Sequence, residues 1–407
     1  MTSAESTSIV IVGHVDHGKS TLIGRLLYDT GNLAADRLAD IRQTSEKLGR
    51  KMEFAFVMDQ FREEREANVT IDTSQTLLKH KGRILTLIDA PGHKEYLKNM
   101  ITGAAQAEFA VLLLDVNEGI REQTDKHAQI LKLLRIEKLA VVINKMDMIH
   151  YEEKTFRQHE HEIRTLLKER DLPVEAIIPI SAYEGENVAI RSKQMDWYTG
   201  ETVLEFLDGC HPTRNDGADG ALELPVQMVY RPNNEELVLG RLERGSLKKD
   251  QNVVVFPSGK VVKVEKIVKY EENPKIASAG ESVALVLKPE GQVKRGDVIC
   301  SEQKPAKGAR EFGAHGFWAA EAPLRLDAPL LVECRTQSVP CRVTKLSGEL
   351  GEGSLQELHA GDVAWIELRT EGDLLVEEEG PLSRVVFQIE GQVAGCGVVG
   401  SVLEKTA

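Results

Sequence analysis

In the first half of the chain, short apolar runs alternate with longer amphipathic stretches. Each run leads into turn residues and then into a helical pattern, as at 123–134 and 154–170. The runs are rich in leucine or β-branched residues: Ile9–Val12, Ile84–Ile88, Ala110–Leu114, Ala140–Ile143 and Ala176–Ile180. Strands without polar alternation, separated by helices, indicate a parallel sheet that is covered on both faces. The pattern therefore predicts a doubly wound α/β domain over residues 1–211.

The pattern changes after residue 211. A polar, glycine-rich stretch over 212–220 predicts a linker, and a weaker linker candidate lies at 304–308. Short β-type runs follow: Leu224–Tyr230, Val253–Phe256, Val261–Val268, Ser282–Leu287, Pro329–Cys334, Cys341–Leu346, Val363–Leu368 and Val385–Ile389. Such spacing is typical of all-β barrels or sandwiches. We therefore expect two all-β barrel domains, over 221–303 and 309–407, after the α/β domain.

The composition is that of a globular protein with several domains. Of the 407 residues, 42% are hydrophobic and 28% are charged, which excludes a disordered or collagen-like chain. The apolar runs are too short to cross a bilayer, and residues 1–8 lack the apolar stretch of a signal peptide. The five cysteines are widely spaced and form no CxxC pair. We therefore expect reduced thiols, no zinc site and a cytoplasmic protein that does not bind membranes.

The first apolar run leads directly into a glycine-rich loop and a helical pattern. Residues 13–20 follow the pattern G-x-x-x-x-G-K-S in the strand–loop–helix context that it requires. In such a loop, backbone N–H groups and a helix N-terminus surround phosphates, so the alternative of a plain surface turn is disfavoured. We expect Lys19 to contact the β- and γ-phosphates and Ser20 to bind Mg²⁺. The candidate phosphate-binding residues are Gly13, His14, Val15, Asp16, His17, Gly18, Lys19, Ser20 and Thr21.

A second motif follows the run at 84–88. Asp89 ends this run beside the predicted phosphate loop, where a carboxylate can hold Mg²⁺ through a water, although Asp-x-x-Gly is also a common turn. Gly92 suits close approach of the backbone to a γ-phosphate, which would make the segment a sensor of the nucleotide state. His93 could orient the attacking water, which makes it a candidate catalytic residue, although a lone histidine is more often structural.

The run at 140–143 ends in Asn144-Lys145-Met146-Asp147. The Asp147 carboxylate can accept hydrogen bonds from guanine N1–H and the exocyclic amine at once, whereas adenine offers no such pair of donors. We expect Lys145 to lie along the base plane and Asn144 to connect neighbouring loops, although this motif alone is also a frequent charged turn. The backbone after the last run can contact the guanine carbonyl, at Ser181, Ala182 and Tyr183. The motifs together favour GTP and GDP over adenine nucleotides.

In order and spacing, these four motifs resemble those of translation-factor-type GTPases. The match extends to residues 57–72, which are similar to the switch segment of that family, and to 240–247 and 293–298, which are similar to its second, β-barrel domain. The resemblance implies GTP hydrolysis, with Thr70 as a second Mg²⁺ ligand and with Lys19, Thr70 and His93 as catalytic residues.

Two branches of this family share the long insert between residues 21 and 70. One is the GTPase subunit of bacterial sulfate adenylyltransferase, and the other is the archaeal and eukaryotic elongation factor that delivers aminoacyl-tRNA. Residues 26–29, 151–156 and 184–189 resemble the sulfate branch, whereas Val-Asp-His-Gly-Lys in the phosphate loop resembles the translation factors.

Charge separates the two branches further. The chain carries a net charge of −13, and residues 308–407 hold eight basic and sixteen acidic side chains, a net −8. A tRNA carrier is expected to need cations in that domain, because each phosphate contact requires one. We therefore expect a GTPase of the sulfate-activating type, whose partner is a catalytic nucleotidyltransferase-like subunit. The alternatives are an elongation-factor-like carrier of aminoacyl-tRNA and a regulatory, GTP-dependent assembly switch.

Overall fold

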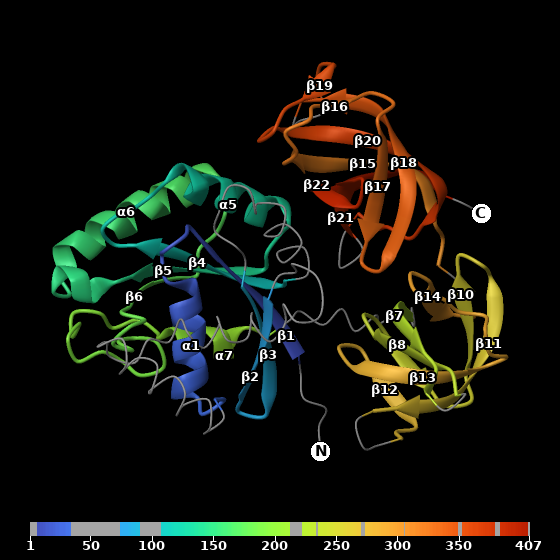
Figure 1. Cartoon of the computed structure of the whole chain (residues 1–407), viewed down its shortest axis with the longest axis horizontal. Helices are drawn as coiled ribbons and strands as arrows, with labels where there is room; N and C mark the ends of the chain where they lie inside the picture. Colours follow the sequence, from blue (N-terminus) through green and yellow to red (C-terminus); the bar gives the residue numbers. More distant parts are fainter. Residues whose placement is uncertain are drawn as a thin grey trace. The chain divides into compact units, whose positions relative to one another are not determined.

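The chain forms two compact units, one over Ser6–Pro212 and the other containing Thr213–Ala407 (Figure 1). The structure is a computed structural model that describes residues 6–33, 74–89, 107–211, 222–232, 235–269, 273–304, 306–348, 352–378 and 383–405. The linker predicted at 212–220 lies outside the described residues. Among those described, no helix is both long enough and apolar enough to cross a membrane.

A six-stranded sheet forms the centre of the first unit, in the order β2-β3-β1-β4-β5-β6. Neighbouring strands run parallel except for β2, which pairs antiparallel with β3. The strands are β1 (Ser6–Gly13), β2 (Ser74–His80), β3 (Arg83–Asp89), β4 (Phe109–Asp115), β5 (Lys138–Asn144) and β6 (Ala176–Pro179). The five apolar runs therefore form the five parallel strands, as predicted, and β2 is an edge strand that the pattern did not predict.

Helices cover both faces of this sheet, which confirms the doubly wound α/β fold (Figure 1). On one face lie α1 (Lys19–Asp29) and α7 (Val203–Gly209), whose apolar side chains share one core with alternate strand residues. On the other face lie α5 (Glu122–Leu133) and α6 (Glu153–Glu169). Because both faces are covered, every residue of β4 is buried. A short 3-10 helix, η2 (Met146–Ile149), follows β5.

A closed barrel, called here the first barrel, begins the second unit, with strands in the order β10-β11-β13-β8-β7-β14. Inward-facing valine, leucine and isoleucine side chains of these strands fill it. The strands are β7 (Glu223–Tyr230), β8 (Leu237–Arg241), β10 (Asn252–Phe256), β11 (Lys260–Val268), β13 (Ser282–Lys288) and β14 (Val298–Ser301), with β9 (Ser246–Lys248) and β12 (Ile276–Ser278) paired beside them.

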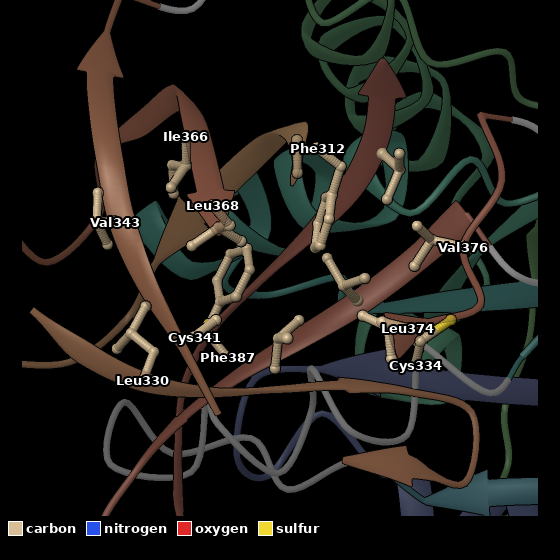
Figure 2. Close-up of a cluster of buried hydrophobic side chains, with 14 of the residues drawn as sticks. Phe312, Leu330, Cys334, Cys341, Val343, Ile366, Leu368, Leu374, Val376 and Phe387 are labelled. Atoms are coloured by element: carbon tan, nitrogen blue, oxygen red, sulfur yellow. The ribbon is translucent and has the colours of Figure 1, made fainter. Parts of the chain in front are cut away.

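The second barrel is also closed, in the order β15-β20-β18-β17-β21-β22. Its core contains aromatic and aliphatic side chains from all around the barrel, among them Phe312, Ile366 and Phe387 (Figure 2). The strands are β15 (Ala309–Trp318), β17 (Pro329–Cys334), β18 (Gln337–Ser347), β20 (Val363–Leu374), β21 (Arg384–Ile389) and β22 (Gln392–Lys405), with β16 (Leu324–Arg325) and β19 (Glu357–Leu358) as a separate pair. The predicted fold class, an α/β domain followed by two all-β barrels, is confirmed.

The two barrels pack against each other. Phe256, Val298 and Cys300 of the first barrel belong to the same buried cluster as the core of the second. Gly296, also in the first barrel, has a φ of 90°, and a Cβ atom there would lie 3.1 Å from the carbonyl oxygen of Thr336. The close contact and the shared core explain why the barrels form one compact unit.

Candidate nucleotide-binding site

Two glycines shape the loop between β1 and α1. A Cβ atom on Gly13 would lie 2.7 Å from the carbonyl oxygen of Leu113 in β4, and one on Gly18 would lie 2.4 Å from Nδ2 of Asn144. Gly18 also has a φ of 92°, in the left-handed region that favours glycine. The loop therefore fits against the carboxyl ends of β4 and β5 only without these side chains. In doubly wound sheets, this edge is where ligands bind.

Lys19 folds back over this loop from the first position of α1. Its ammonium group donates hydrogen bonds to the carbonyl oxygens of Gly13, at 2.7 Å, and of His14, at 2.9 Å, and only 9% of the residue is exposed. These acceptors are neutral, whereas phosphate oxygens are charged and make stronger hydrogen bonds to an ammonium group. Ser20 and Thr21 follow in the same turn, half-buried at the helix N-terminus, where anions are favoured.

His14 and His17, both predicted to bind phosphates, direct their ring nitrogens to protein groups instead. His17 is buried, with Nδ1 3.1 Å from the carbonyl oxygen of Leu113 and Nε2 3.3 Å from Glu118. Burial lowers the pKa of His17, and the contacts with Leu113 and Glu118 oppose this effect. The ring of His14 contacts Gln123 of α5 through Nδ1 and packs edge-on against His17. Both ring nitrogens of His17 and Nδ1 of His14 therefore contact protein groups, and the backbones of the two residues can face a phosphate.

His127, one turn after Gln123 on α5, lies behind the same loop and was not predicted from the sequence. Burial, together with the nearby charges of Lys19, His14 and His17, lowers its pKa to about 3. The ring is therefore neutral at physiological pH and does not repel the ammonium group of Lys19. A possible sequence signal is the polar pair Gln123 and His127, which stand four residues apart on the buried face of a helix.

Asn144, at the end of β5, joins two of the predicted motifs. Its Nδ2 donates to the carbonyl oxygen of His17 at 2.8 Å, and its Oδ1 accepts from the backbone N–H of Ala182 at 3.0 Å. The side chain is buried, so these two hydrogen bonds hold the phosphate loop and the loop after β6 at a fixed separation. The structure thus brings the motifs at 13–20, 144–147 and 181–183 together at one edge of the sheet.

Lys145 is held by a carboxylate that the sequence analysis did not predict. Its Nζ lies 2.7 Å from Oδ2 of Asp115, the last residue of β4. Burial raises the pKa of Asp115, but hydrogen bonds from Lys145 and Asn117 and the charge of Lys145 outweigh it and hold the pKa below its usual value. Asp115 is therefore charged at neutral pH and fixes the lysine side chain. The available sequence signal was its position, since it ends a buried apolar run as Asp89 does.

Asp147 lies on η2, two residues after Lys145. Its Oδ1 atom is buried and has no hydrogen-bond partner among the described residues. A buried acceptor without a donor costs roughly 1–3 kcal/mol, more when it is charged. The two neighbouring N–H donors on the Watson–Crick edge of guanine would satisfy it, and adenine would not. The residues present at this position therefore fit a guanine nucleotide.

The loop after β6 forms a tight turn around Ser181. Its Oγ accepts from the N–H of Glu184 at 3.1 Å, and its carbonyl oxygen accepts from Gly185 at 2.7 Å. Ala182 is buried, whereas Tyr183 has an exposed side chain and accepts at its carbonyl oxygen from Arg25 of α1 at 3.4 Å. The turn therefore presents backbone rather than side chains to the site.

The predicted magnesium ligands are described only in part. Asp89, the last residue of β3, is buried beside β1, where it pairs in register with Ile11, and Ser20 lies at the start of α1. Carboxylate and hydroxyl oxygens are donors that Mg²⁺ prefers. Thr70, Gly92 and His93 lie outside the described residues, so their roles at the metal, the γ-phosphate and the attacking water stay predictions.

Comparisons with known proteins agree with this site. Residues 4–213 match the family model of the elongation factor Tu GTP binding domain, and residues 236–300 match that of elongation factor Tu domain 2. Elongation factor 1-alpha of Pyrococcus woesei is 36% identical over 423 residues and that of Archaeoglobus fulgidus is 34% identical over 413, each match covering 97% of both chains.

Two solved structures are similar in fold. The GTP-bound GTPase-like domain of S. cerevisiae Ski7 covers 97% of each chain, with a TM-score of 0.66 at 18% identity. A bacterial selenocysteine-specific elongation factor, EF-Sec, covers 97% of this chain and 58% of that chain, with a TM-score of 0.58 at 23% identity.

The resemblance to translation-factor-type GTPases is thus confirmed over nearly the whole chain. Proteins of this family bind GTP and GDP with Mg²⁺ and hydrolyse GTP, in agreement with the cofactors expected from the sequence. The chain belongs to the elongation factor Tu family of GTP-binding proteins.

Proposed function

We propose that this protein is a GTPase of the elongation factor 1-alpha type, which carries an aminoacyl-tRNA in its GTP-bound state. The relatives that match 97% of the chain bear the name elongation factor 1-alpha, which favours this alternative over the sulfate-activating one. The nucleotidyltransferase-like partner and the sulfate-activating role gain no support from these relatives.

In this proposal, the edge of the sheet holds the nucleotide. Lys19 and the backbone of residues 13–21 bind the phosphates, and Asp147 reads the guanine base, with Lys145 beside it and Asn144 joining the two parts. Ser20 and Asp89 hold Mg²⁺, which supplies charge to neutralise the phosphates when it is bound.

A cavity of 420 Å³ on the first barrel is the observation that supports an RNA ligand. Three of its lining residues are lysines, and among the described residues none of their ammonium groups pairs with a carboxylate. Unpaired cations in a concave surface bind phosphates. The other lining residues include carboxylates that can accept from a ribose hydroxyl and apolar groups that can contact a base. The lining is Glu235, Lys249, Glu265, Lys266, Ile267, Asn273, Pro274, Lys275 and Val286.

A titration of fluorescent aminoacyl-tRNA at several salt concentrations tests this proposal. We expect tight binding with a non-hydrolysable GTP analogue and much weaker binding with GDP. Replacing Lys249, Lys266 and Lys275 together with Ala should weaken binding and lower the slope of log K against log[salt] by roughly two units. The control replaces three lysines of the same barrel that do not line the cavity: Lys248, Lys260 and Lys294.

Two results would contradict the proposal. Equal weakening by both triple variants would show that binding depends on overall charge and not on the cavity. Absence of tRNA binding in both nucleotide states would remove the carrier function, and GTP turnover that rises with ATP, sulfate and a co-purified subunit would restore the sulfate-activating one.

A further inference from the structure

The loop that carries Asp147 has an unusual backbone. Lys145, His150 and Tyr151 have φ values of 67°, 53° and 59°, all in the left-handed region that residues other than glycine rarely adopt. Two of these residues are adjacent and close the loop just after η2. Such a backbone persists only where surrounding contacts stabilise it. The contacts of residues 145–151 therefore determine where the Asp147 carboxylate lies.

Backbone hydrogen bonds close the turn within the loop. The N–H of Tyr151 donates to the carbonyl oxygen of Met146 at 2.8 Å, and the N–H of Met146 donates to that of Ile180 at the end of the neighbouring strand. The side of the loop near β6 is thus fixed by the sheet. On the other side, the N–H of His150 donates to the carbonyl oxygen of Asp147 at 3.2 Å, and the carbonyl oxygen of Tyr151 has its partner in another part of the chain.

That partner is Trp197, which lies in the segment before α7. Its Nε1–H donates to the carbonyl oxygen of Tyr151 at 3.2 Å. The N–H of a buried tryptophan usually donates to a nearby acceptor. Here the acceptor is the carbonyl oxygen of Tyr151, whose backbone is in the left-handed region.

Aromatic packing holds the Trp197 ring in place. The ring lies against the buried Phe156 of α6, with centroids 5.2 Å apart, and edge-on to Tyr198 at 6.3 Å. The Arg157 guanidinium covers both Phe156 and Trp197, at 5.5 and 5.7 Å from their centroids. Trp197 therefore connects the start of α6 to the end of the loop that carries Asp147.

The Tyr151 side chain is itself close to the base-reading carboxylate. Burial, together with the charges of Asp147, Glu186 and Glu184, raises the pKa of Tyr151 to about 12. A shift of the Tyr151 backbone would consequently move a neighbour of Asp147 as well as the end of η2.

We propose that Trp197 is a positioning residue for guanine recognition, whose indole N–H fixes the Tyr151 carbonyl and thereby keeps the Asp147 carboxylate directed at the base. The inference rests on the proposed role of Asp147. It adds a specificity determinant that lies 50 residues from Asp147 in sequence and acts through the backbone of Tyr151.

The test compares Trp197→Phe, which keeps a six-membered aromatic ring and removes the pyrrole ring with its N–H donor, with Tyr198→Phe. Tyr198→Phe is the matched control, because it removes a hydrogen bond of the same cluster, from the Tyr198 hydroxyl to the carbonyl oxygen of Glu201 at 3.0 Å. Affinities are measured for GDP and for IDP, which lacks the exocyclic amine. Trp197→Phe should weaken GDP binding roughly threefold to tenfold, the effect of one hydrogen bond, and should weaken IDP binding less. Tyr198→Phe should leave the ratio of GDP to IDP affinity unchanged.

A second arm combines Trp197→Phe with Asp147→Asn, with melting temperatures as a measure of folding. In the Asp147→Asn background, Trp197→Phe should have no further effect on GDP affinity. Equal losses for GDP and IDP, or additive losses in the double variant, would overturn the role of Trp197. If Asp147→Asn itself leaves the preference for GDP over IDP intact, the assignment of Asp147 to the base fails, independently of Trp197.

Discussion

A buried carboxylate between the two barrels makes the stability of the second unit depend on pH. Glu223, at the start of β7, accepts from Arg244 at 3.3 Å, and Arg244 also makes a two-pronged ion pair with Glu377 of the second barrel, at 2.7 and 2.6 Å. Glu243 and Arg335 face the same cluster. Three carboxylates thus share two guanidinium groups, and Oε2 of Glu223 is buried without a hydrogen-bond partner among the described residues.

The size of the effect follows from the pKa of Glu223. Burial, the largest cause, and the charges of Glu377 and Glu243 raise this pKa, whereas Arg244 and Arg335 lower it, and the net result is a rise from 4.5 to about 7. Because the folded state holds the proton more tightly than the unfolded state, neutral Glu223 stabilises the fold fully below about pH 4.5. That stabilisation is lost as the pH rises through about 7. The difference corresponds to roughly 3 kcal/mol, of which roughly 2–3 kcal/mol falls between pH 5 and 8.

The assay is urea unfolding of the full chain at several pH values, for the wild type and for Glu223→Gln, with linear extrapolation to water. The wild type should lose roughly 2–3 kcal/mol of unfolding free energy between pH 5 and 8 beyond any loss in the variant, because glutamine does not titrate. Glu236→Gln is the control, since Glu236 is equally buried in the first barrel but bonds to Arg231 and the N–H of Gly291 outside the cluster. Identical pH profiles for the wild type and Glu223→Gln would refute the reasoning.

Three further predictions concern the nucleotide site. Gly18→Ala should weaken GDP binding more than tenfold in an equilibrium titration, because its Cβ would lie 2.4 Å from Asn144 Nδ2, whereas Gly209→Ala, with nothing within 4 Å, should not change it. Asp147→Asn should shift preference from GDP toward XDP in a competition assay, and an undiminished preference for GDP would count against the base assignment. His93→Ala should slow single-turnover GTP hydrolysis while GTP affinity is retained, so an equal hydrolysis rate would remove its proposed role.

In the first unit, the sequence predicted the strands that are buried on both faces and missed the edge strand β2. In the barrels it predicted half-exposed strands such as β11 and β18, but it missed β14, which is buried along its whole length. A strand such as β4, with every residue buried, is a nearly continuous apolar run. It can therefore be recognised from its own few residues. The edge strand β2 alternates buried Thr76 and Leu78 with exposed Gln75, Leu77 and Lys79, so its apolar residues do not mark one face of the short S-Q-T-L-L-K-H stretch. The short strands β9 and β12 were not predicted either, because each has a single buried residue and so shows no alternating pattern.

The residues of the candidate site also fall into those that the sequence predicted and those that it did not. Motifs such as G-x-x-x-x-G-K-S are visible because their chemistry lies within a few consecutive residues. Asp115, His127 and Trp197 were missed because each acts on a residue that only the fold brings near: Lys145, Lys19 and Tyr151. No pattern along the chain marks such pairs. The sequence therefore predicts which groups bind the ligand better than it predicts which groups hold them in place.

Summed charge was the weakest of the sequence arguments, because phosphates respond to unpaired cations nearby, within a Debye length of roughly 8 Å. In the second barrel, basic side chains pair with acidic ones: Arg310 with Asp373, Arg325 with Glu357, Lys345 with Glu367 and Arg369 with Glu311. The first barrel, residues 221–303, has thirteen basic and twelve acidic side chains, a net +1, and three of its lysines line one cavity. An acid excess in one barrel therefore does not argue against an RNA ligand on the other. The salt dependence of tRNA binding reports on the lysines that contact phosphates. It is therefore the measurement that distinguishes the effect of local lysines from the effect of net charge.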